Sequence, residues 1–374
     1  MDQFISKQAE LTQEIEDICF EFRIPGQLVE IETISAGNIN NTYRVVYRDN
    51  GVATSYIVQK INKYVFKNPR HIMHNIQLIS EHLRSKLPDP DDKRAWLHFC
   101  TTRNGSNFLI AGDGFWRAYY CIEDAIAYDA SDDPEVLRAA GIAFGDFQRN
   151  LSDFDASLLY ETIPDFHNTQ KRLQTLFRHT QEDPVARVQE VLPELDYIKS
   201  VSELASHLCA LRDRGAIPLR VTHNDTKTNN VLLDEATNRP LTVIDLDTVM
   251  PGLAMHDFGD AVRFAANTAV EDEPDESKVS LNLDLYRAFA EGFISRTAAS
   301  LTPLELDTMA LGALTITIEL AVRFLDDYIT GDLYFKTIYP EHNLIRTRCQ
   351  LALARDMQKK FPDMEQIIRE IRHA

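Results

Sequence analysis

A polar loop held between short apolar runs constrains the fold of this chain more than any other feature. Asp225 is followed five positions later by Asn230, and the runs 219–221 and 231–233 lie on either side of the pair. Short apolar runs bounded by turn residues are typical of β-strands. We therefore expect two strands that fix both ends of the loop and hold its polar side chains in set positions.

The loop has the spacing H-x-D-x-x-x-x-N of kinase catalytic loops, with His223 at the first position. Phosphoryl transfer needs a carboxylate that accepts or orients the acceptor hydroxyl, and oxygen ligands that hold Mg²⁺ against nucleotide phosphates. Asp225 is predicted to be the base and Asn230 a metal ligand. His223 is expected to brace the loop by packing and hydrogen bonding rather than to act as a base.

A third apolar run, 241–244, ends in Asp245, which places a second carboxylate at a strand tip as a metal ligand. Asp257, in the string Asp-Phe-Gly, is rejected as the metal site because it follows the turn signal at 250–252. It is expected to be a helix N-cap or a brace for the catalytic loop. Asp247 either assists the metal or ties down the turn that follows.

Length and charge limit the classes of partner. With 374 residues and 44% hydrophobic composition, the chain is expected to form two lobes, each with its own core. The formal net charge of −18 argues against a nucleic acid or an anionic membrane as partner, because neutralising phosphates requires clustered Lys and Arg. Small molecules are the expected partners, and the sequence indicates no obligate protein partner.

Cysteine usage and hydropathy predict a cytoplasmic protein. The five cysteines are scattered without a C-x-x-C pair, which is typical of reduced thiols and excludes a structural zinc site of that kind. The first ten residues lack an apolar core, so no signal peptide is expected. The most apolar segment, 309–322, is interrupted by Glu319 and is too short to span a membrane.

Hydrophobic periodicity predicts a small sheet and two helices in the first third of the chain. Residues 7–22 show helical spacing, and a second helix carries Ile72, Ile76, Ile79, Leu83 and Leu87 on one face. A turn at 49–51 joins two of the expected strands into a hairpin. The strand-like runs are 29–34, 41–47, 56–58, 95–100 and 115–122.

Helices dominate after a boundary near residues 120–124. The expected helices are 134–151, 194–214, 257–269, 283–297, 303–329 and 343–373. This order predicts an α+β, protein-kinase-like fold of two lobes: a small N-terminal antiparallel sheet with a helix, and a larger, mainly helical C-terminal lobe. We assign residues 1–120 to a nucleotide-binding lobe and residues 121–374 to a catalytic and substrate-binding lobe.

In such a fold, ATP is expected to lie between the lobes. The loop between the first two strands would cover its phosphates with backbone N–H groups, and the hinge backbone would bind adenine. Because this loop has a single glycine, it is not a G-x-G-x-x-G loop, and an ordinary hairpin is the alternative. The expected nucleotide contacts are Gly37, Asn38, Ile39, Asn40, Asn41, Thr42, Gln59, Tyr120, Cys121, Ile122 and Glu123.

The usual phosphate-binding lysine of a kinase strand is missing. The run 56–58 leads into Gln59, and Lys60 falls on the opposite face by the period-two alternation of a strand. Gln59 can donate a hydrogen bond but supplies no charge, so phosphate neutralisation would fall on Mg²⁺ and on the loop. Gln77 stands where a helix would offer a glutamate partner, which is consistent with an uncharged Gln59.

Several segments resemble the N-acetylhexosamine 1-kinases, within the superfamily of aminoglycoside phosphotransferases and choline kinases. The resemblance implies ATP- and Mg²⁺-dependent phosphorylation of the anomeric hydroxyl of N-acetylglucosamine or N-acetylgalactosamine, and hence a sugar-binding C-terminal lobe. The segments are INNTY at 39–43, FGDFQ at 144–148, FDAS at 154–157, VTHNDTK at 221–227, IDLDT at 244–248, GDLYF at 331–335 and YPEHNL at 339–344.

The resemblance implies a role for each matching residue. Asp225 would orient and deprotonate the sugar hydroxyl, Asn230 and Asp245 would bind Mg²⁺, and Lys227 would neutralise the migrating phosphoryl group. Arg323 and Tyr334 would contact the sugar. Arg323 has an alternative as the ion-pair partner of a carboxylate at helical spacing, with Glu319, Asp326 or Asp327 as candidates.

Two other functions remain open at this point. A kinase of the same fold could act on another hexose, an amino alcohol or an aminoglycoside. A nucleotide-binding pseudokinase is a third class, which the joint presence of Asp225, Asn230 and Asp245 disfavours.

Overall fold

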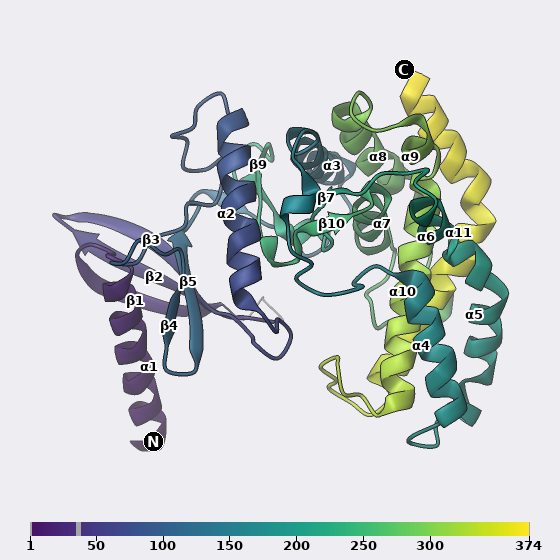
Figure 1. Ribbon diagram of the computed structural model, residues 1–374, viewed down its shortest axis with the longest axis horizontal. Coiled ribbons are helices and arrows are strands. Elements are labelled where there is room, and N and C mark those ends of the chain that lie inside the picture. The colour runs from purple at the N-terminus through teal and green to yellow at the C-terminus, as the bar shows by residue number, and fades with distance from the viewer. Residues whose placement is uncertain (1, 35–38, 374) are drawn as a thin grey trace.

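The computed structural model describes residues 2–34 and 39–373. Gly37 and Asn38 of the expected phosphate loop lie outside the described residues. Figure 1 shows two lobes, with a sheet and two helices in one and mainly helices in the other, which confirms the predicted fold class.

The small lobe is built on an antiparallel sheet of five strands in the order β1-β2-β3-β5-β4. Asn50 and Gly51 both have positive φ at the tip of the β2–β3 hairpin, as the predicted turn requires. The strands are β1 (Gln27–Ile34), β2 (Asn41–Asp49), β3 (Val52–Lys60), β4 (Leu109–Ala111) and β5 (Gly114–Tyr120).

The strand predicted at 95–100 is wrong. This segment contributes only the isolated bridge between Phe99 and Tyr119, while β4, which the sequence analysis missed, pairs with β5. The reason is competition for one edge of β5. Because β4 occupies that edge as far as Trp116, only the end of β5 is left for the 98–100 segment.

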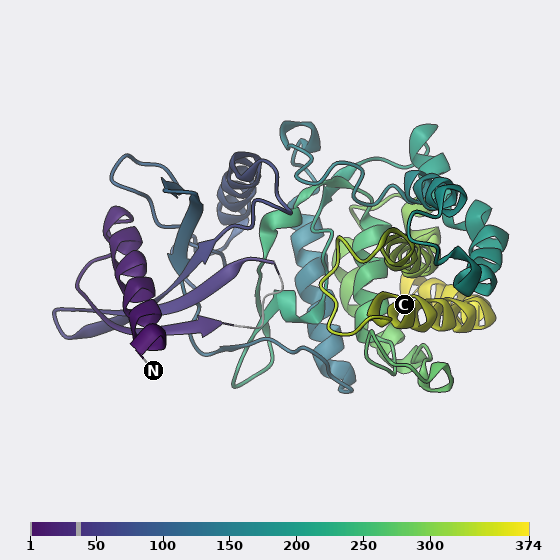
Figure 2. The ribbon, with the colours of Figure 1, turned by 90° about the horizontal axis from the view of Figure 1, so that it is seen from below.

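Alternation along the strands divides the sheet into two faces. Tyr43, Val45 and Trp116 pack under α1 (Asp2–Glu21), whereas α2 (Pro69–Lys86) lies over the other face with Ile72 and Ile76 buried. Figures 1 and 2 show the two helices on opposite sides of the sheet. The face that carries Gln59 is therefore the one turned toward the helical lobe.

The helical lobe follows the predicted order with three differences. The helix expected at 194–214 is broken at Ser206, the one expected at 303–329 is broken at Thr308, and α4 was missed. The helices are α3 (Pro134–Asn150), α4 (Thr169–Glu182), α5 (Leu192–Ala205), α6 (His207–Asp213), α7 (Ala254–Ala265), α8 (Leu283–Thr297), α9 (Pro303–Asp307), α10 (Met309–Thr330) and α11 (His342–His373).

Two small sheets hold the segment that contains the catalytic motif. β6 (Ala125–Ile126), β8 (Val231–Asp234) and β9 (Pro240–Val243) form one, and β7 (Arg220–Thr222) pairs with β10 (Met250–Gly252) in the other. The turn predicted at 250–252 is thus a short strand, because its backbone pairs with β7. These sheets fix both ends of the polar loop, as the apolar runs predicted.

Helices α3 and α8 approach closely enough to exclude side chains at their contact. A Cβ built on Gly292 would lie 2.2 Å from the Arg138 carbonyl oxygen, and one built on Gly141 would lie 2.3 Å from that of Phe289. Both obstacles are helix backbone, which cannot move aside as a side chain does. Glycine at these positions therefore sets the helix separation in the core of the lobe.

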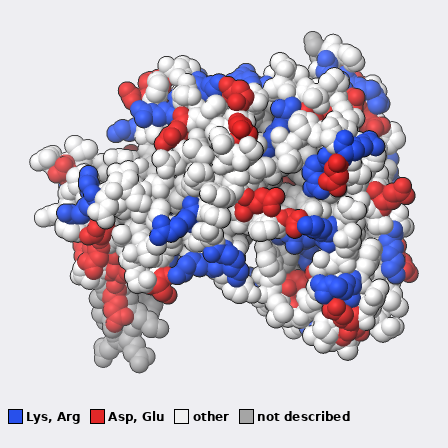
Figure 3. Space-filling model, viewed as in Figure 1, with Lys and Arg blue, Asp and Glu red and all other residues white. Residues whose placement is uncertain are grey.

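No helix that the structure describes is long and apolar enough to cross a membrane. On the face shown in Figure 3, acidic and basic side chains are interspersed and do not form a basic stripe.

Gly292→Ala tests the close approach of α3 and α8. The added methyl group would force the helices apart, and we expect the free energy of unfolding to fall by about 2–4 kcal/mol. Urea denaturation followed by circular dichroism measures this change. Ser295→Ala, at an exposed site on the same helix, is the control and is expected to stay within about 0.5 kcal/mol; equal effects of the two variants would contradict the packing argument.

Candidate active site

Two carboxylates of α7 hold the backbone of the polar loop. Asp257 accepts hydrogen bonds from the N–H groups of His223 and Asn224, each at 2.8 Å, and Asp260 accepts one from Thr226 at 2.9 Å. One turn of helix separates the two carboxylates, so they act on successive parts of the loop. Asn224 has a left-handed backbone with φ of 65°, which these bonds stabilise.

Asp257 is the brace that the sequence analysis offered as one alternative, and the other, a helix N-cap, is wrong. The helix begins earlier, at Ala254, with Leu253 as its N-cap. Gln148 also donates to Asp257 at 2.7 Å. Burial raises the pKa of the Asp257 carboxyl, and the hydrogen bonds from His223 and Asn224 oppose that rise.

The predicted base, Asp225, is held from two sides. Asn230 Nδ2 donates to the Asp225 carbonyl oxygen at 2.8 Å and to Asp225 Oδ2 at 3.2 Å. Lys227 Nζ lies 3.2 Å from Asp225 Oδ1, and this carboxylate raises the pKa of Lys227. The structure thus brings the two predicted catalytic residues and one predicted metal ligand into direct contact.

His223 has the bracing role that was expected. Its Nε2 lies 2.9 Å from the carbonyl oxygen of Ile244, and its Nδ1 accepts the Asp225 N–H at 3.3 Å. The rings of Phe144 and Phe147 meet it edge to face. Since both ring nitrogens are engaged and the side chain is buried, His223 is not available as a base.

Asp245, the second predicted metal ligand, follows β9 with a left-handed backbone of φ 59°. The Ile244 N–H donates to the Asn230 carbonyl oxygen at 2.9 Å, which ties this strand tip to the catalytic loop. The side chain keeps an exposed surface, yet protein crowds it on its other sides. That burial, with the neighbouring carboxylates of Asp247 and Asp225, raises the pKa of Asp245 to about 7.

A divalent cation fits this set of oxygen donors. Mg²⁺ is usually bound by one or two carboxylates together with substrate phosphates and water, not by a complete protein cage. Asp245 offers a carboxylate destabilised by burial and by its acidic neighbours. The amide nitrogen of Asn230 donates to Asp225, and its amide oxygen accepts no hydrogen bond within the described residues. Within the described residues there is no group of three or more His, Cys, Asp or Glu side chains that could hold a metal ion.

Asp247 ties down the loop that follows Asp245, the second of its two predicted roles. Arg117 Nη1 donates to its Oδ1, and Asn40 Nδ2 donates to its Oδ2 at 2.7 Å. Arg117 also donates from Nε to Gln59 at 2.8 Å. Arg117 is the buried cation of this cluster, and sequence analysis missed it.

Lys60 lies on the face opposite Gln59, as predicted, and its Nζ is 3.5 Å from Glu14 on α1. The expectation for Gln77 is wrong: it is exposed and donates to Glu81 one turn along α2, so it does not face Gln59. Gln59 instead donates to Thr42 at 3.0 Å.

The predicted hinge leaves part of its backbone for a ligand. The Tyr120 N–H donates to the His98 carbonyl oxygen and the Cys121 N–H to that of Ser55, both at 3.0 Å. Those two donors are already used, so an adenine ring would depend on the backbone of Ile122 and Glu123.

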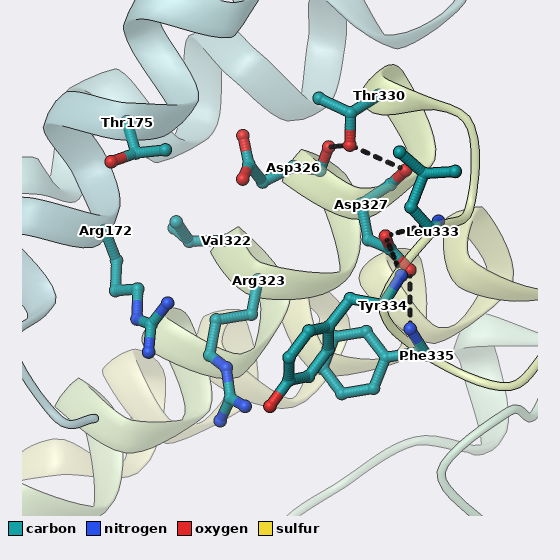
Figure 4. Close-up of a pocket in the computed structure, with 10 residues that line it drawn as sticks. All are labelled: Arg172, Thr175, Val322, Arg323, Asp326, Asp327, Thr330, Leu333, Tyr334 and Phe335. Atoms are coloured by element: carbon teal, nitrogen blue, oxygen red, sulfur yellow. Dashed lines mark hydrogen bonds between the residues drawn. The ribbon is translucent and has the colours of Figure 1, made fainter. Parts of the chain in front are cut away.

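Arg323 and Tyr334 line one cavity of about 190 Å³ between α4, α10 and the loop after α10. Figure 4 shows the guanidinium groups of Arg172 and Arg323 pointing the same way, with the Tyr334 hydroxyl beside the latter. Asp327 shapes this loop, because its carboxylate accepts the N–H groups of three consecutive residues: Leu333, Tyr334 and Phe335.

The ion-pair alternative for Arg323 is wrong, because all three candidate carboxylates are engaged elsewhere. Glu319 bonds to His167 and Thr169, Asp326 to His179, and Asp327 to backbone N–H groups. Arg323 instead lies over the Phe166 ring, 4.9 Å from its centroid.

Arg172 gives the cavity a second guanidinium that forms no ion pair within the described residues. In the described part of the chain its Nε has no hydrogen-bond partner, and its Nη2 reaches only the Phe166 carbonyl oxygen, at 3.3 Å. Burial and the charge of Arg323 lower the pKa of Arg172. Asp326 and Asp327 also line the cavity, so it holds charges of both signs, and its guanidinium groups offer hydrogen-bond donors.

His167 connects this cavity with the catalytic loop. It lies next to Phe166, which packs under Arg323, and its Nε2 is 3.3 Å from the Asn224 carbonyl oxygen. Its Nδ1 is 2.8 Å from Glu319, one turn before Arg323 on α10. The cavity therefore lies near the residue that precedes Asp225.

Comparison with known proteins identifies the family. Residues 30–291 match the family model described as the phosphotransferase enzyme family. The chain belongs to this family. Its match covers the catalytic loop, the strand tip at Asp245 and most of the small sheet.

Solved structures support the fold of this phosphotransferase. An aminoglycoside phosphotransferase from Alicyclobacillus acidocaldarius is 14% identical with a TM-score of 0.64, covering 95% of this chain and 96% of that chain. A choline kinase from Cryptosporidium parvum is 14% identical with a TM-score of 0.56, over 94% and 96%. A spectinomycin phosphotransferase in complex with ADP and spectinomycin is 13% identical with a TM-score of 0.55, over 97% and 98%.

Sequence analysis of this phosphotransferase missed Arg117, Asp260, His167 and Arg172. A signal for Arg117 was present, since it is the one charged residue within the run 115–120. The other three are single polar residues on or beside helices, and only tertiary packing brings them to the loop or the cavity.

His256 predicts a pH dependence of stability. This imidazole is buried behind the catalytic loop, and burial lowers its pKa from 6.5 to about 3. Between those pH values the unfolded chain binds a proton that the folded chain does not, so its cost to folding is absent above pH 6.5 and grows as pH falls. From pH 7.5 to 5.0 the wild type should lose about 2 kcal/mol more stability than His256→Leu.

Urea denaturation at the two pH values measures this difference. His207→Leu, at an exposed position, is the control and should follow the wild type. A His256→Leu curve parallel to the wild type would show that the buried imidazole does not titrate as described.

Proposed function

We propose that this phosphotransferase uses Mg·ATP to phosphorylate the anomeric hydroxyl of an N-acetylhexosamine, giving the sugar 1-phosphate and ADP. We also propose that residues 1–120 bind the nucleotide and residues 121–374 carry catalysis and the sugar site. The observation that carries the acceptor class is the pair of guanidinium groups, neither in an ion pair within the described residues, in the cavity that Phe166 and His167 link to the catalytic loop.

The proposal gives each residue a separate task. Asp225 takes the proton from O1 of the sugar as that oxygen forms a bond to the γ-phosphorus, and the bond from phosphorus to the bridging oxygen of ADP breaks. Lys227 neutralises charge on the phosphoryl group. Asn230 and Asp245 would hold Mg²⁺, which supplies charge neutralisation at the phosphates when bound.

ATP as the phosphate donor is supported by the ADP in the related spectinomycin phosphotransferase. It is also supported by the small five-stranded lobe, which contacts the loop after Asp245 through Arg117 and Asn40. The contacts proposed for it are the loop that includes Ile39, Asn40, Asn41 and Thr42, with Gln59 and the hinge residues 120–123. A pseudokinase is disfavoured, because the contacts among Asp225, Lys227 and Asn230 are those that a working loop needs.

The charge of the cavity distinguishes among acceptors. The two carboxylates that line the cavity, Asp326 and Asp327, already accept hydrogen bonds from His179 and from backbone N–H groups. A cationic acceptor, such as an amino alcohol or an aminoglycoside, would have to compete for these carboxylates and would lie beside Arg172 and Arg323. A neutral acetamido sugar brings hydroxyl and carbonyl oxygens that guanidinium donors can bind. Tyr334 adds an aromatic face and a hydroxyl.

Cavity size points the same way. The volume of about 190 Å³ is below the roughly 300–1,000 Å³ that is typical for drug-sized ligands. A single sugar ring is therefore favoured over an aminoglycoside of several rings.

An acceptor panel tests the reaction. With Mg·ATP, we expect turnover chiefly on N-acetylglucosamine and N-acetylgalactosamine, over glucose, galactose, choline and kanamycin, with an anomeric phosphate in the ³¹P NMR spectrum. Asp225→Asn keeps the shape of the side chain but removes the base, and should lower kcat by about 10²–10⁴-fold. Turnover confined to choline or kanamycin would refute the sugar assignment.

Arg172→Met tests the cavity as the acceptor site. Loss of guanidinium donors should raise KM for the sugar by about tenfold and leave KM for ATP unchanged, because the cavity lies away from the nucleotide lobe. Arg178→Met, an exposed arginine on the same helix, is the control and should change neither constant. An unchanged sugar KM in Arg172→Met would place the acceptor elsewhere.

A further inference from the structure

The positive charge that a lysine on β3 would supply to the phosphate site is carried instead by Arg117 on the neighbouring strand, β5. Gln59 on β3 is paired directly with Arg117 on β5, and cross-strand partners lie on the same face of a sheet. Arg117 therefore points toward the cleft side of the sheet, while Lys60 points to α1. A guanidinium stands beside the position where the lysine is missing.

Arg117 is buried and joins two lobes. Its Nε donates to Gln59 Oε1 at 2.8 Å and its Nη1 to Asp247, and both members of the Arg117–Asp247 pair have side chains 3% exposed. Gln59 belongs to the small sheet, whereas Asp247 belongs to the loop that starts at Asp245. The ion pair thus links the sheet to the proposed metal ligand.

The second oxygen of Asp247 reaches the phosphate loop. It accepts from Asn40 Nδ2 at 2.7 Å, and Asn40 Oδ1 accepts the Asn62 N–H at 3.0 Å. Asn62 Nδ2 in turn donates to the Ile39 carbonyl oxygen at 3.2 Å. One carboxylate therefore connects three parts of the molecule that would surround the donor phosphates.

We propose that Arg117 is the positioning residue of the phosphate site, acting through Asp247 to hold the metal-ligand loop and the phosphate loop in register with the sheet. In many kinases an ion pair between a strand lysine and a helix glutamate has this role. Here Arg117 stands in for the lysine, and Asp247, in the loop that begins at Asp245, stands in for the glutamate. The inference rests on ATP as phosphate donor, as proposed above, and is independent of the acceptor.

Stability alone does not explain this arrangement. A buried ion pair is often no more stabilising than well-packed apolar residues of similar volume, because both charges lose their hydration. The chain nevertheless uses one carboxylate here to engage a buried arginine and an asparagine of the loop. These hydrogen bonds fix the position of the loops that face the phosphates. An apolar contact in the same place would supply no directional bonds.

The test compares binding of Mg·ADP with binding of adenosine, by titration calorimetry. In the double variant Arg117→Met/Asp247→Leu no buried charge is left unpaired, so the chain should fold. We expect its Kd for Mg·ADP to rise tenfold or more and its Kd for adenosine to stay within twofold. Arg117→Lys keeps the charge and should bind Mg·ADP more tightly than the double variant, but less tightly than the wild type.

A second buried pair provides the matched control. Arg220 and Glu305 form an ion pair between β7 and α9, with side chains 15% and 0% exposed. The variant Arg220→Met/Glu305→Leu removes a comparable pair and should leave the ratio of the two Kd values unchanged. Thermal melting of each variant checks that it is folded.

Each outcome separates the two proposals. If the wild type does not bind Mg·ADP, the ATP-dependent function fails and the positioning role fails with it. If the wild type binds and the Arg117→Met/Asp247→Leu variant binds Mg·ADP equally well, the positioning role alone is overturned. A loss of adenosine binding as large as the loss of Mg·ADP binding would also overturn it, since the role would then be general folding.

Discussion

The hydrogen bonds between two carboxylates of α7 and the backbone of the catalytic loop are the interaction on which the rest of the site depends. A tight loop with a left-handed residue leaves N–H groups that no strand or helix can satisfy, and buried N–H groups without acceptors are costly. Asp257 and Asp260 accept them. Helix α7 is packed in the core of the helical lobe, so the loop that is bonded to it is held in one conformation. Asp225 is therefore in position before any substrate binds.

A second set of contacts relates this rigid loop to the small lobe. Asp245 lies beside the catalytic carboxylate, and two residues later Asp247 bonds to Arg117 of the sheet and Asn40 of the phosphate loop. The helical lobe thus positions Asp225, the proposed base, while the Arg117–Asp247 pair is proposed to align the nucleotide-facing loops with it. Positional accuracy in phosphoryl transfer depends on both, because the reaction requires the attacking and leaving oxygens nearly in line.

The fold and the centre of the site were predictable because they are local in sequence. The loop from Asp225 to Asn230 and the strand tip at Asp245 lie within one segment, and period-two alternation correctly put Lys60 away from the cleft. Failures came where partners are remote: segment 95–100 lost its edge to β4, and Gln77 faces away although its spacing looked suitable. Arg117 stood out as the one charged residue of its strand, but its role was overlooked because its partner Asp247 is 130 positions away.

Local contacts at the cavity, and not the net charge, support the acceptor that we propose. The whole chain carries −18, which by itself is compatible with a cationic acceptor. At the cavity, however, Glu319, Asp326 and Asp327 are engaged by histidines or by backbone N–H groups, while Arg172 and Arg323 remain without carboxylate partners among the described residues. A carboxylate that already accepts hydrogen bonds is less available to a ligand, whereas a guanidinium N–H without an acceptor can bind one. An overall acidic protein can therefore offer guanidinium donors to the neutral, oxygen-rich acceptor that we propose.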